Sequence, residues 1–332
     1  MAPSTPDGAT AAGGDRSGIT ARLRSFDPRN YVVYLSFLAI LAFFSVALLN
    51  KGFLSYDNFQ NILRQTAMVS VMAIGMTFAL SAGEIDLSIG STVALAALVA
   101  ALVVRETNLV LALVGALGVG LVVGLVNGLL TTKLRIPSFL VTLGTLGIVS
   151  GIAREITNLQ AVPITDQTYN FIFGSGDLGP VSSLFVWTAI LAAVGHVVYR
   201  KTPFGRALLA TGGNRAAARF SGVAVDRIRV SALVITGLTA AFAGMLYAGR
   251  LHGARYTLGE QDLLTVIAAV IIGGTSLFGG RGSIVGAVIG SIIMGMLNNG
   301  LILMGLSVSE QMMARGVIII LAVALSLREQ AD

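Results

Sequence analysis

The sequence has 332 residues, of which 55% are hydrophobic and only 11% are charged, whereas about 25% of the residues in a soluble domain are charged. So few charges cannot cover the surface of soluble domains, and the composition predicts a membrane protein. The chain has no cysteine and only two histidines. This excludes disulfide bonds, a thiolate or histidine-based metal site and a cysteine nucleophile, and we expect no metal ion, no cofactor and no catalytic residue.

The N-terminal residues 1–29 are rich in Ala, Gly, Ser, Thr and Arg and contain no apolar core followed by a cleavage site. This composition is typical of a flexible tail and not of a cleaved signal peptide. We expect the tail to lie in the cytoplasm and residues 30–328 to form one transmembrane domain.

Long stretches without Asp, Glu, Lys or Arg follow the tail. Most of them meet or approach the roughly 20 apolar residues that a helix needs to cross about 30 Å of hydrocarbon. They predict an all-α, polytopic membrane protein with about ten transmembrane helices. The expected spans are residues 31–49, 58–81, 86–104, 108–132, 136–152, 182–199, 230–250, 263–279, 283–302 and 312–327.

The basic residues are distributed unevenly around these spans. With a cytoplasmic N-terminus, 15 of the 22 Lys and Arg residues fall on the inner side and 7 on the outer side, which agrees with the positive-inside rule. Both termini and the loop 200–229 are then cytoplasmic, and the loop 153–181 is external. Because the basic residues cluster at span ends, membrane topology accounts for the isoelectric point near 10.0, and no nucleic-acid partner is expected.

The inner loop, residues 200–229, has the sequence of two short capped helices. Its apolar and basic side chains predict a surface that docks on a protein partner; the open alternative is contact with lipid headgroups. Phe204, Leu208 and Phe220 are expected to be exposed, and Gly213 is expected to supply a left-handed turn. The residues assigned to docking are the caps and helix positions Thr202, Pro203, Phe204, Gly212, Gly213, Asn214, Ala217, Phe220 and Gly222.

Two spans share a pattern of glycines every fourth residue, which lie along one helix face and allow close packing. Asn-Gly pairs accompany both patterns, and an amide in an apolar span needs partners or water. We therefore assign the amides to a solute path and the glycines to helix packing. The amides are Asn127, Asn298 and Asn299, and the glycines are Gly120, Gly124, Gly128, Gly282, Gly286 and Gly290.

A second repeated motif, Gly-Glu-x-Asp-Leu, occurs at residues 83–87 and 259–263. Spans 2–5 would then match spans 7–10 in the opposite orientation, and inverted repeats are typical of transporters. Glu84 and Asp86 are read either as carboxylates at a helix N-terminus or as part of the solute path. Because a charge in hydrocarbon is costly, we expect both side chains to avoid lipid.

Several enzyme and transporter signatures are missing. The sequence has no Gly-x-x-x-x-Gly-Lys-Ser/Thr motif for ATP, no Gly-x-Ser-x-Gly or His-Glu-x-x-His motif, and no charged residue at the centre of an expected span. Ion-coupled transporters usually have such a charge. The energy for transport must therefore come from another subunit, or the protein is a passive channel.

Four segments together resemble the permease subunits of bacterial ABC importers for ribose, xylose, arabinose and related monosaccharides, and the resemblance covers about residues 30–328. Position 84, often Gly in this pattern, is Glu here. The segments are GEIDLSIGS (83–91), IPSFLVTLGT (136–145), GGNRAAARFSG (212–222) and GGTSLFGGRGS (273–283), the last followed by Asn298-Asn299-Gly300.

The resemblance implies a type II ABC importer-like fold in the bacterial cytoplasmic membrane, in contact with membrane lipids. It also implies partners: cytoplasmic ATP-binding subunits docked on the loop 200–229, an extracytoplasmic sugar-binding protein, and a second permease copy or a similar permease. The chain itself would be a transport subunit and not an enzyme. Two alternatives remain open: a stand-alone secondary transporter or channel, and an ABC permease for branched-chain amino acids or nucleosides.

Overall fold

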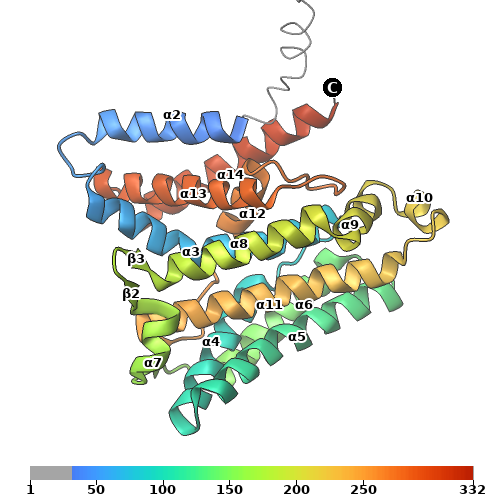
Figure 1. Ribbon diagram of the computed structural model, residues 1–332, viewed down its shortest axis with the longest axis horizontal. Coiled ribbons are helices and arrows are strands. Elements are labelled where there is room, and N and C mark those ends of the chain that lie inside the picture. The colour runs from blue at the N-terminus through green and yellow to red at the C-terminus, as the bar shows by residue number, and fades with distance from the viewer. Residues whose placement is uncertain (1–31, 332) are drawn as a thin grey trace, which may run out of the picture. The chain divides into compact units, whose positions relative to one another are not determined.

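The computed structural model describes residues 32–331, and the expected tail, residues 1–29, lies outside them. A helix overlaps each of the ten expected spans, although the helices differ in length (Figure 1). These helices are α2 (Val32–Ala47), α3 (Tyr56–Ser81), α4 (Ile89–Glu106), α5 (Leu109–Lys133), α6 (Ser138–Glu155), α8 (Ser183–Lys201), α11 (Val225–Leu251), α12 (Asp262–Ile272), α13 (Ile284–Met304) and α14 (Val308–Ala331).

Six of the described helices, α3, α4, α5, α8, α11 and α13, are long and apolar enough to cross a membrane. Helix α12 is shorter than expected, because it ends at Ile272 and not near residue 279. Gly273 and Gly274 follow it, and Gly274 has a φ of +86°, a backbone conformation that glycine tolerates and other residues rarely adopt. Helix α4 also begins later than expected, at Ile89.

The core of the described bundle lies around α3 and α11, whose apolar residues are largely buried. Glycines of α5 lie directly against α11: a methyl group on Gly124 would come within 2.6 Å of the Val234 Cα atom, and one on Gly128 within 2.9 Å of the Val230 Cα atom. Gly120 faces Gly237 in the same contact. The missing side chains let the two backbones approach closely, as in other membrane helix pairs.

The glycines of the second pattern lie against other parts of the chain. Gly286 and Gly290 face the C-terminal end of α12, at Gly273 and Ala269 respectively. Gly282 precedes α13 and lies beside the hydroxyl groups of Ser81 and Tyr199. Glycines of both patterns therefore lie at close contacts, but with different neighbours.

The segment after α6 contains short elements as well as helix, so the described chain is not purely α-helical. Strand β1 (Val162–Pro163) pairs antiparallel with β4 (Gly253–Ala254), and β2 (Asp177–Leu178) pairs antiparallel with β3 (Val181–Ser182). Between them lie α7 (Gln167–Asn170) and the π-helix η2 (Phe171–Ser175).

This segment packs on the bundle through aromatic side chains. Tyr169 and Phe173 are buried, and the Trp187 indole stacks on Phe173 with ring centroids 5.8 Å apart. The Trp187 Nε1–H also donates a hydrogen bond to the Ile172 carbonyl at 2.9 Å. Residues 153–181 therefore form a folded cap on one end of the helices.

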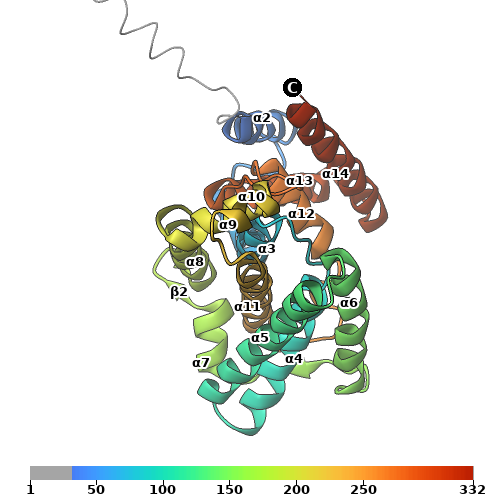
Figure 2. The same cartoon turned by 90° about the vertical axis from the view of Figure 1, so that its right-hand side faces the viewer.

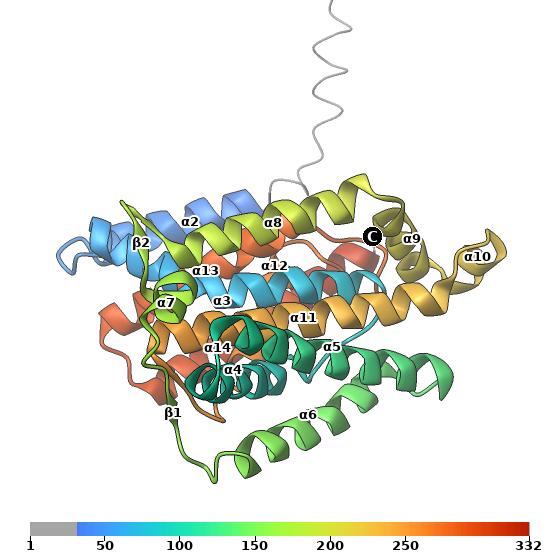
Figure 3. The same ribbon diagram turned by 60° about the horizontal axis from the view of Figure 1, so that its bottom comes forward.

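Two further helices, α9 (Pro203–Gly213) and α10 (Arg215–Phe220), connect α8 to α11. Figure 3 shows them at one end of the long helices, with α7 and β2 at the other end, and Figure 1 shows the same arrangement. The loops 153–181 and 200–229 thus lie at opposite ends of the bundle, as a protein with these loops on opposite membrane sides requires.

Candidate functional site

Helices α9 and α10 have the caps that their sequence predicts. The Thr202 hydroxyl accepts a hydrogen bond from the Gly205 N–H at 3.3 Å, and Pro203 occupies the first turn of α9. The Asn214 side chain accepts one from the Ala217 N–H at 3.0 Å and so caps α10. These bonds satisfy backbone donors that a helix N-terminus leaves unpaired.

The expected exposure of the apolar side chains in this loop is correct only in part. Phe220 is 94% exposed, but Leu208 is fully buried. Phe204 is half-buried and stacks against Phe78 of α3, with ring centroids 6.3 Å apart. The apolar side chains of α9 therefore anchor this helix on the protein's own bundle, and Phe220 on α10 is the apolar side chain that remains available to a partner.

Gly213 does not supply a left-handed turn, because α9 continues through it with a helical backbone. Gly212 is needed for a different reason: it lies against the Ser81 carbonyl at the end of α3 and against the Gly280 backbone. The Gly280 N–H donates a hydrogen bond to that same Ser81 carbonyl at 3.0 Å. The end of α9, the end of α3 and the glycine-rich turn 273–282 therefore meet at one point.

Glu84 connects α10 to the transmembrane bundle. Its carboxylate is 1% exposed and accepts hydrogen bonds from the Arg215 Nη2 atom at 2.6 Å and the Arg229 Nε atom at 2.5 Å. Arg215 is the first residue of α10 and also donates to the Gly83 carbonyl at 2.8 Å. Arg215 therefore connects α10 to the segment that precedes α4, while the more buried Arg229 supplies the second bond to the carboxylate.

That segment, residues 82–88, crosses from α3 to α4 without helical structure, and side chains of α6 satisfy its backbone. The Ile85 N–H donates to the Ser138 hydroxyl and the Leu87 N–H to the Thr142 hydroxyl, both at 3.0 Å. In membrane proteins, non-helical backbone is tolerated where other parts of the protein satisfy its hydrogen bonds. We refer to residues 82–88 as the unwound segment.

Asp86 in the unwound segment is buried and belongs to a short polar network. Its Oδ1 atom accepts hydrogen bonds from the Ser88 N–H at 2.9 Å and the Ser88 hydroxyl at 2.6 Å. Asn127 of α5 donates to the Ser88 hydroxyl at 2.9 Å. Asp86 Oδ2 and Asn127 Oδ1 are buried and accept no hydrogen bond from the described residues. The network joins two of the expected path residues, Asp86 and Asn127.

The other two amides lie elsewhere. Asn299 of α13 exchanges two hydrogen bonds with Asn58 of α3, at 2.8 and 3.0 Å. The Asn298 side-chain oxygen accepts from Arg315 of α14 at 3.0 Å. Both amides therefore find polar partners between helices, as amides in an apolar span require, and they are not in contact with Asn127.

A pocket of about 440 Å³ lies where the two Gly-Glu-x-Asp-Leu motifs meet. Gly90, in the first turn of α4, packs against the Gly259 carbonyl just before α12. Gly83 and Gly259, which begin the two motifs, both have left-handed backbones, with φ of +72° and +77°. Figure 2 shows α6 on the same side of the bundle as α4 and α5. The lining residues are Leu87, Gly90, Ser91, Leu146, Gly147, Ser150, Gly151, Arg154, Glu260 and Leu263.

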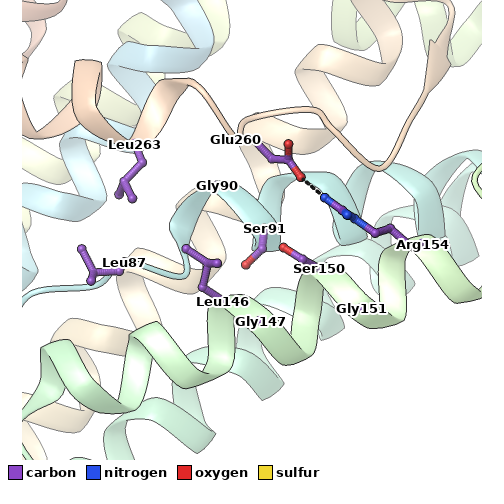
Figure 4. Close-up of a pocket in the computed structure, with 10 residues that line it drawn as sticks. All are labelled: Leu87, Gly90, Ser91, Leu146, Gly147, Ser150, Gly151, Arg154, Glu260 and Leu263. Atoms are coloured by element: carbon purple, nitrogen blue, oxygen red, sulfur yellow. Dashed lines mark hydrogen bonds and ion pairs between the residues drawn. The ribbon is translucent and has the colours of Figure 1, made fainter. Parts of the chain in front are cut away.

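The pocket is polar at one end and apolar at the other (Figure 4). Leu87, Leu146 and Leu263 gather at the apolar end. At the opposite end, the Arg154 Nη2 atom of α6 forms an ion pair with Glu260 at 3.0 Å. The Arg154 guanidinium also lies over the Tyr256 ring, 5.3 Å from its centroid.

Sequence reasoning did not predict the pocket, and it named none of the lining residues on α6. Ser150 and Arg154 of α6 carried no local signal, because only the folded chain brings them beside Ser91 and Glu260. Glu260 was part of the repeated motif, and that repeat was the one available pointer. Among the residues that the structure describes, no group of three or more His, Asp or Glu side chains is placed to hold a metal ion.

The chain matches the family described as "Branched-chain amino acid transport system / permease component" over residues 58–323, and it belongs to this family. It is 43% identical to the ribose import permease protein of Bacillus subtilis, over 86% of this chain and 89% of that protein. It is 38% identical to the ribose import permease protein of Escherichia coli, over 89% and 94% of the two chains. No solved structure matches it.

A third relative is an L-arabinose ABC transporter permease protein of Azospirillum brasilense, which is 36% identical over 96% of this chain and 92% of its own length. Together, the family and the apolar helices identify the chain as a multi-pass inner-membrane permease subunit. The ABC family implies ATP-binding subunits as separate partners. These findings confirm the family resemblance that the sequence motifs predicted.

Proposed function

We propose that the chain is the membrane-spanning subunit of an ABC importer that moves a monosaccharide, such as a ribose-like pentose, a hexose or a related polyol, into the cell. ATP hydrolysis takes place in a separate subunit. The support from sequence is that the ribose and arabinose permeases resemble it along nearly their whole length. The stand-alone transporter and the passive channel have no comparable support.

The observation that carries the proposal is the contact of α10 with the bundle. A short capped helix bears the 94% exposed Phe220 at one end and Arg215 at the other, and Arg215 binds the buried Glu84. An exposed aromatic side chain beside charged residues suits a protein partner. A helix that only lay on lipid headgroups would not need an ion pair to a buried carboxylate. The ATP-binding subunit docks here.

The proposed topology has ten spans with both termini in the cytoplasm, α9 and α10 on the cytoplasmic side and residues 153–181 outside. Spans 2–5 and 7–10 form inverted repeats of a type II importer, with the two Gly-Glu-x-Asp-Leu motifs as equivalent positions. The meeting of the two motifs at one pocket supports this arrangement. A sugar-binding protein delivers its ligand at the outer end, and a second permease copy completes the transporter.

Within this proposal, Glu84 belongs to the coupling between α10 and the bundle. Asp86 and Asn127 support the unwound segment beside the solute path, because their network with Ser88 orders the start of α4. Asn298 binds Arg315 and keeps α13 in register with α14. Asn299 binds Asn58 and keeps α13 in register with α3.

Uptake by cells tests the function. The gene is deleted from its host and restored on a plasmid, and uptake of labelled ribose, arabinose, xylose, glucose, leucine and uridine is compared. We expect the uptake of one or more sugars to depend on the gene. This uptake should stop when the catalytic lysine of the partner ATPase is replaced. Sugar uptake that is identical with and without the gene would refute the proposal, and uptake that does not need ATP hydrolysis would favour a channel.

The second candidate is an amino-acid permease, because the family description names branched-chain amino acids. The pocket offers one observation in its favour: Arg154 and Glu260 match the carboxylate and ammonium groups of an amino acid. Leucine uptake that depends on the gene, without any sugar uptake, would establish this candidate in place of the first.

A further inference from the structure

The pocket between α4, α6 and the start of α12 is built in three layers along α6. The leucines form the first layer and the Arg154–Glu260 ion pair forms the last. Between them lie Ser91 and Ser150 with the backbone of neighbouring glycines, and Figure 4 shows both serine side chains in the central part of the pocket. Small side chains in the middle layer leave space there, while larger side chains line both ends.

We propose that this middle layer is a transient binding compartment for a neutral, polyhydroxylated ligand, namely the monosaccharide in transit, with Ser91 and Ser150 as its hydrogen-bonding groups. The inference rests on the proposed sugar-permease function and adds to it the place where the sugar pauses. The volume of about 440 Å³ lies within the range of ligand pockets, about 300–1,000 Å³.

The hydrogen-bonding capacity of the two serines suits hydroxyl groups. The Ser91 O–H donates to the Ser88 carbonyl at 2.9 Å, so the Ser91 oxygen is left to accept from a ligand. The Ser150 hydroxyl forms no hydrogen bond with the described residues and can both donate and accept. A sugar hydroxyl also does both, and it needs no counter-charge. The charged groups of the pocket are already paired with each other.

The two ends of the compartment differ in the contacts that must break before a ligand can pass. At the polar end, the ion pair joins α6 to the turn before α12, and both partners are partly exposed, at 48% and 36%. A surface pair of this kind is worth only about 0–1 kcal/mol, so a small helix movement separates it. At the other end lie Leu87 of the unwound segment, Leu146 of α6 and Leu263 of α12, so a movement of the unwound segment shifts Leu87 against the other two. The ion pair therefore separates easily, while the apolar contacts at the other end change when Leu87 moves.

Cysteine labelling tests the compartment directly, because the natural chain has no cysteine and is itself the unlabelled control. Ser150→Cys and Gly151→Cys are introduced into the whole transporter with its ATP-binding and sugar-binding subunits, in proteoliposomes. Serine and cysteine are similar in size, and a side chain at Gly151 meets no atom within 4 Å. Both variants are treated with a small neutral methanethiosulfonate, with and without the transported sugar. Gln160→Cys, on the external loop, is the matched control.

We expect labelling of either pocket variant to reduce sugar uptake at least ten-fold, and saturating sugar to slow that labelling about five-fold or more. Labelling of the Gln160→Cys variant should leave sugar uptake unchanged, and sugar should not slow that labelling. In the Gly151→Cys background, Ser150→Ala should raise the sugar concentration that protects by half about five-fold, the loss expected for one hydrogen bond of about 1 kcal/mol.

Three results would overturn the inference: labelling that leaves uptake unchanged, labelling at a rate that sugar does not alter, or no labelling of the pocket variants while the Gln160→Cys variant reacts. Failure of the proposed function is a different result, since the unmodified transporter would then take up no sugar at all.

Discussion

Replacing Glu84 with Gln should destabilise the protein by about 3 kcal/mol or more. Glu84 is 1% exposed, and Arg229 is only 13% exposed with Glu84 as its ion-pair partner among the described residues. Removal of one partner from a buried ion pair typically costs about 3–5 kcal/mol, because the other charge is left without compensation. Gln keeps the size and one acceptor oxygen of Glu, so the loss reports mainly on the charge.

Arg215 and Arg229 should not contribute equally to the free energy of unfolding. Arg215 is 46% exposed, and pairs with such an exposed partner are worth about 0–1 kcal/mol. Arg215→Gln should therefore cost no more than about 1 kcal/mol, while Arg229→Gln should cost clearly more, because it leaves Glu84 with a half-exposed partner. Arg215 also binds the Gly83 carbonyl, so its main contribution is to hold α10 on the unwound segment.

The free energy of unfolding of the three variants can be measured by SDS titration in mixed micelles, with sugar uptake and ATP hydrolysis measured on the same preparations. We expect Arg215→Gln to leave stability nearly unchanged and to lower the sugar transported per ATP hydrolysed. Equal destabilisation by Arg215→Gln and Arg229→Gln, or a neutral Glu84→Gln, would refute this account of the carboxylate. A stable Arg215→Gln variant that transports the normal amount of sugar per ATP hydrolysed would show that transport does not need this ion pair.

Three further predictions concern topology, docking and the network around the unwound segment. Cysteines introduced at Gln160 and Ser221 should react with impermeant thiol reagents only from outside and only from inside, respectively; reaction of both from outside would exclude the proposed topology. Phe220→Ser should weaken co-purification of the ATP-binding subunit at least ten-fold, as expected for an aromatic anchor, whereas Phe171→Ser on the external side should not. Asn127→Leu should cost roughly 1–3 kcal/mol, because the Ser88 hydroxyl loses its donor, and should lower sugar flux in assembled complexes; full flux would assign Asn127 to packing alone.

The positions of the helices could be predicted from the sequence because charge is excluded from hydrocarbon. Their ends could not, since an apolar stretch does not show where a helix stops. Helix α12 stops at Gly273 although residues 273–279 carry no charge. Helix α4 starts only at Ile89, because residues 85–87 bind side chains of α6 in place of their own helix.

The caps at Thr202 and Asn214 could also be predicted, because capping depends on residues three positions apart. The burial of Leu208 could not, since an amphipathic pattern shows that a helix has an apolar face and does not show what covers it. For Glu84, the sequence offered a choice between a helix N-terminus and a solute path; α4 begins only at Ile89, so Glu84 is not at a helix N-terminus, and its carboxylate binds Arg215 and Arg229. The two arginines that bind Glu84 lie 131 and 145 residues further along the chain, and no local pattern connects positions so far apart.

Two stretches of the chain, joined by the polar contacts of Arg215, connect the proposed docking surface to the pocket. Phe220 and Arg215 lie at the two ends of the same six-residue helix, so a partner that moves Phe220 also moves Arg215. Arg215 holds Gly83 and Glu84, and the unwound segment continues through Leu87 into the pocket wall. A helical connection here would have its backbone bonds satisfied internally and would resist such displacement. The backbone of this segment instead donates hydrogen bonds to hydroxyl groups of α6. Its movement therefore changes the contacts between α4 and α6, and these two helices contribute the serines of the pocket.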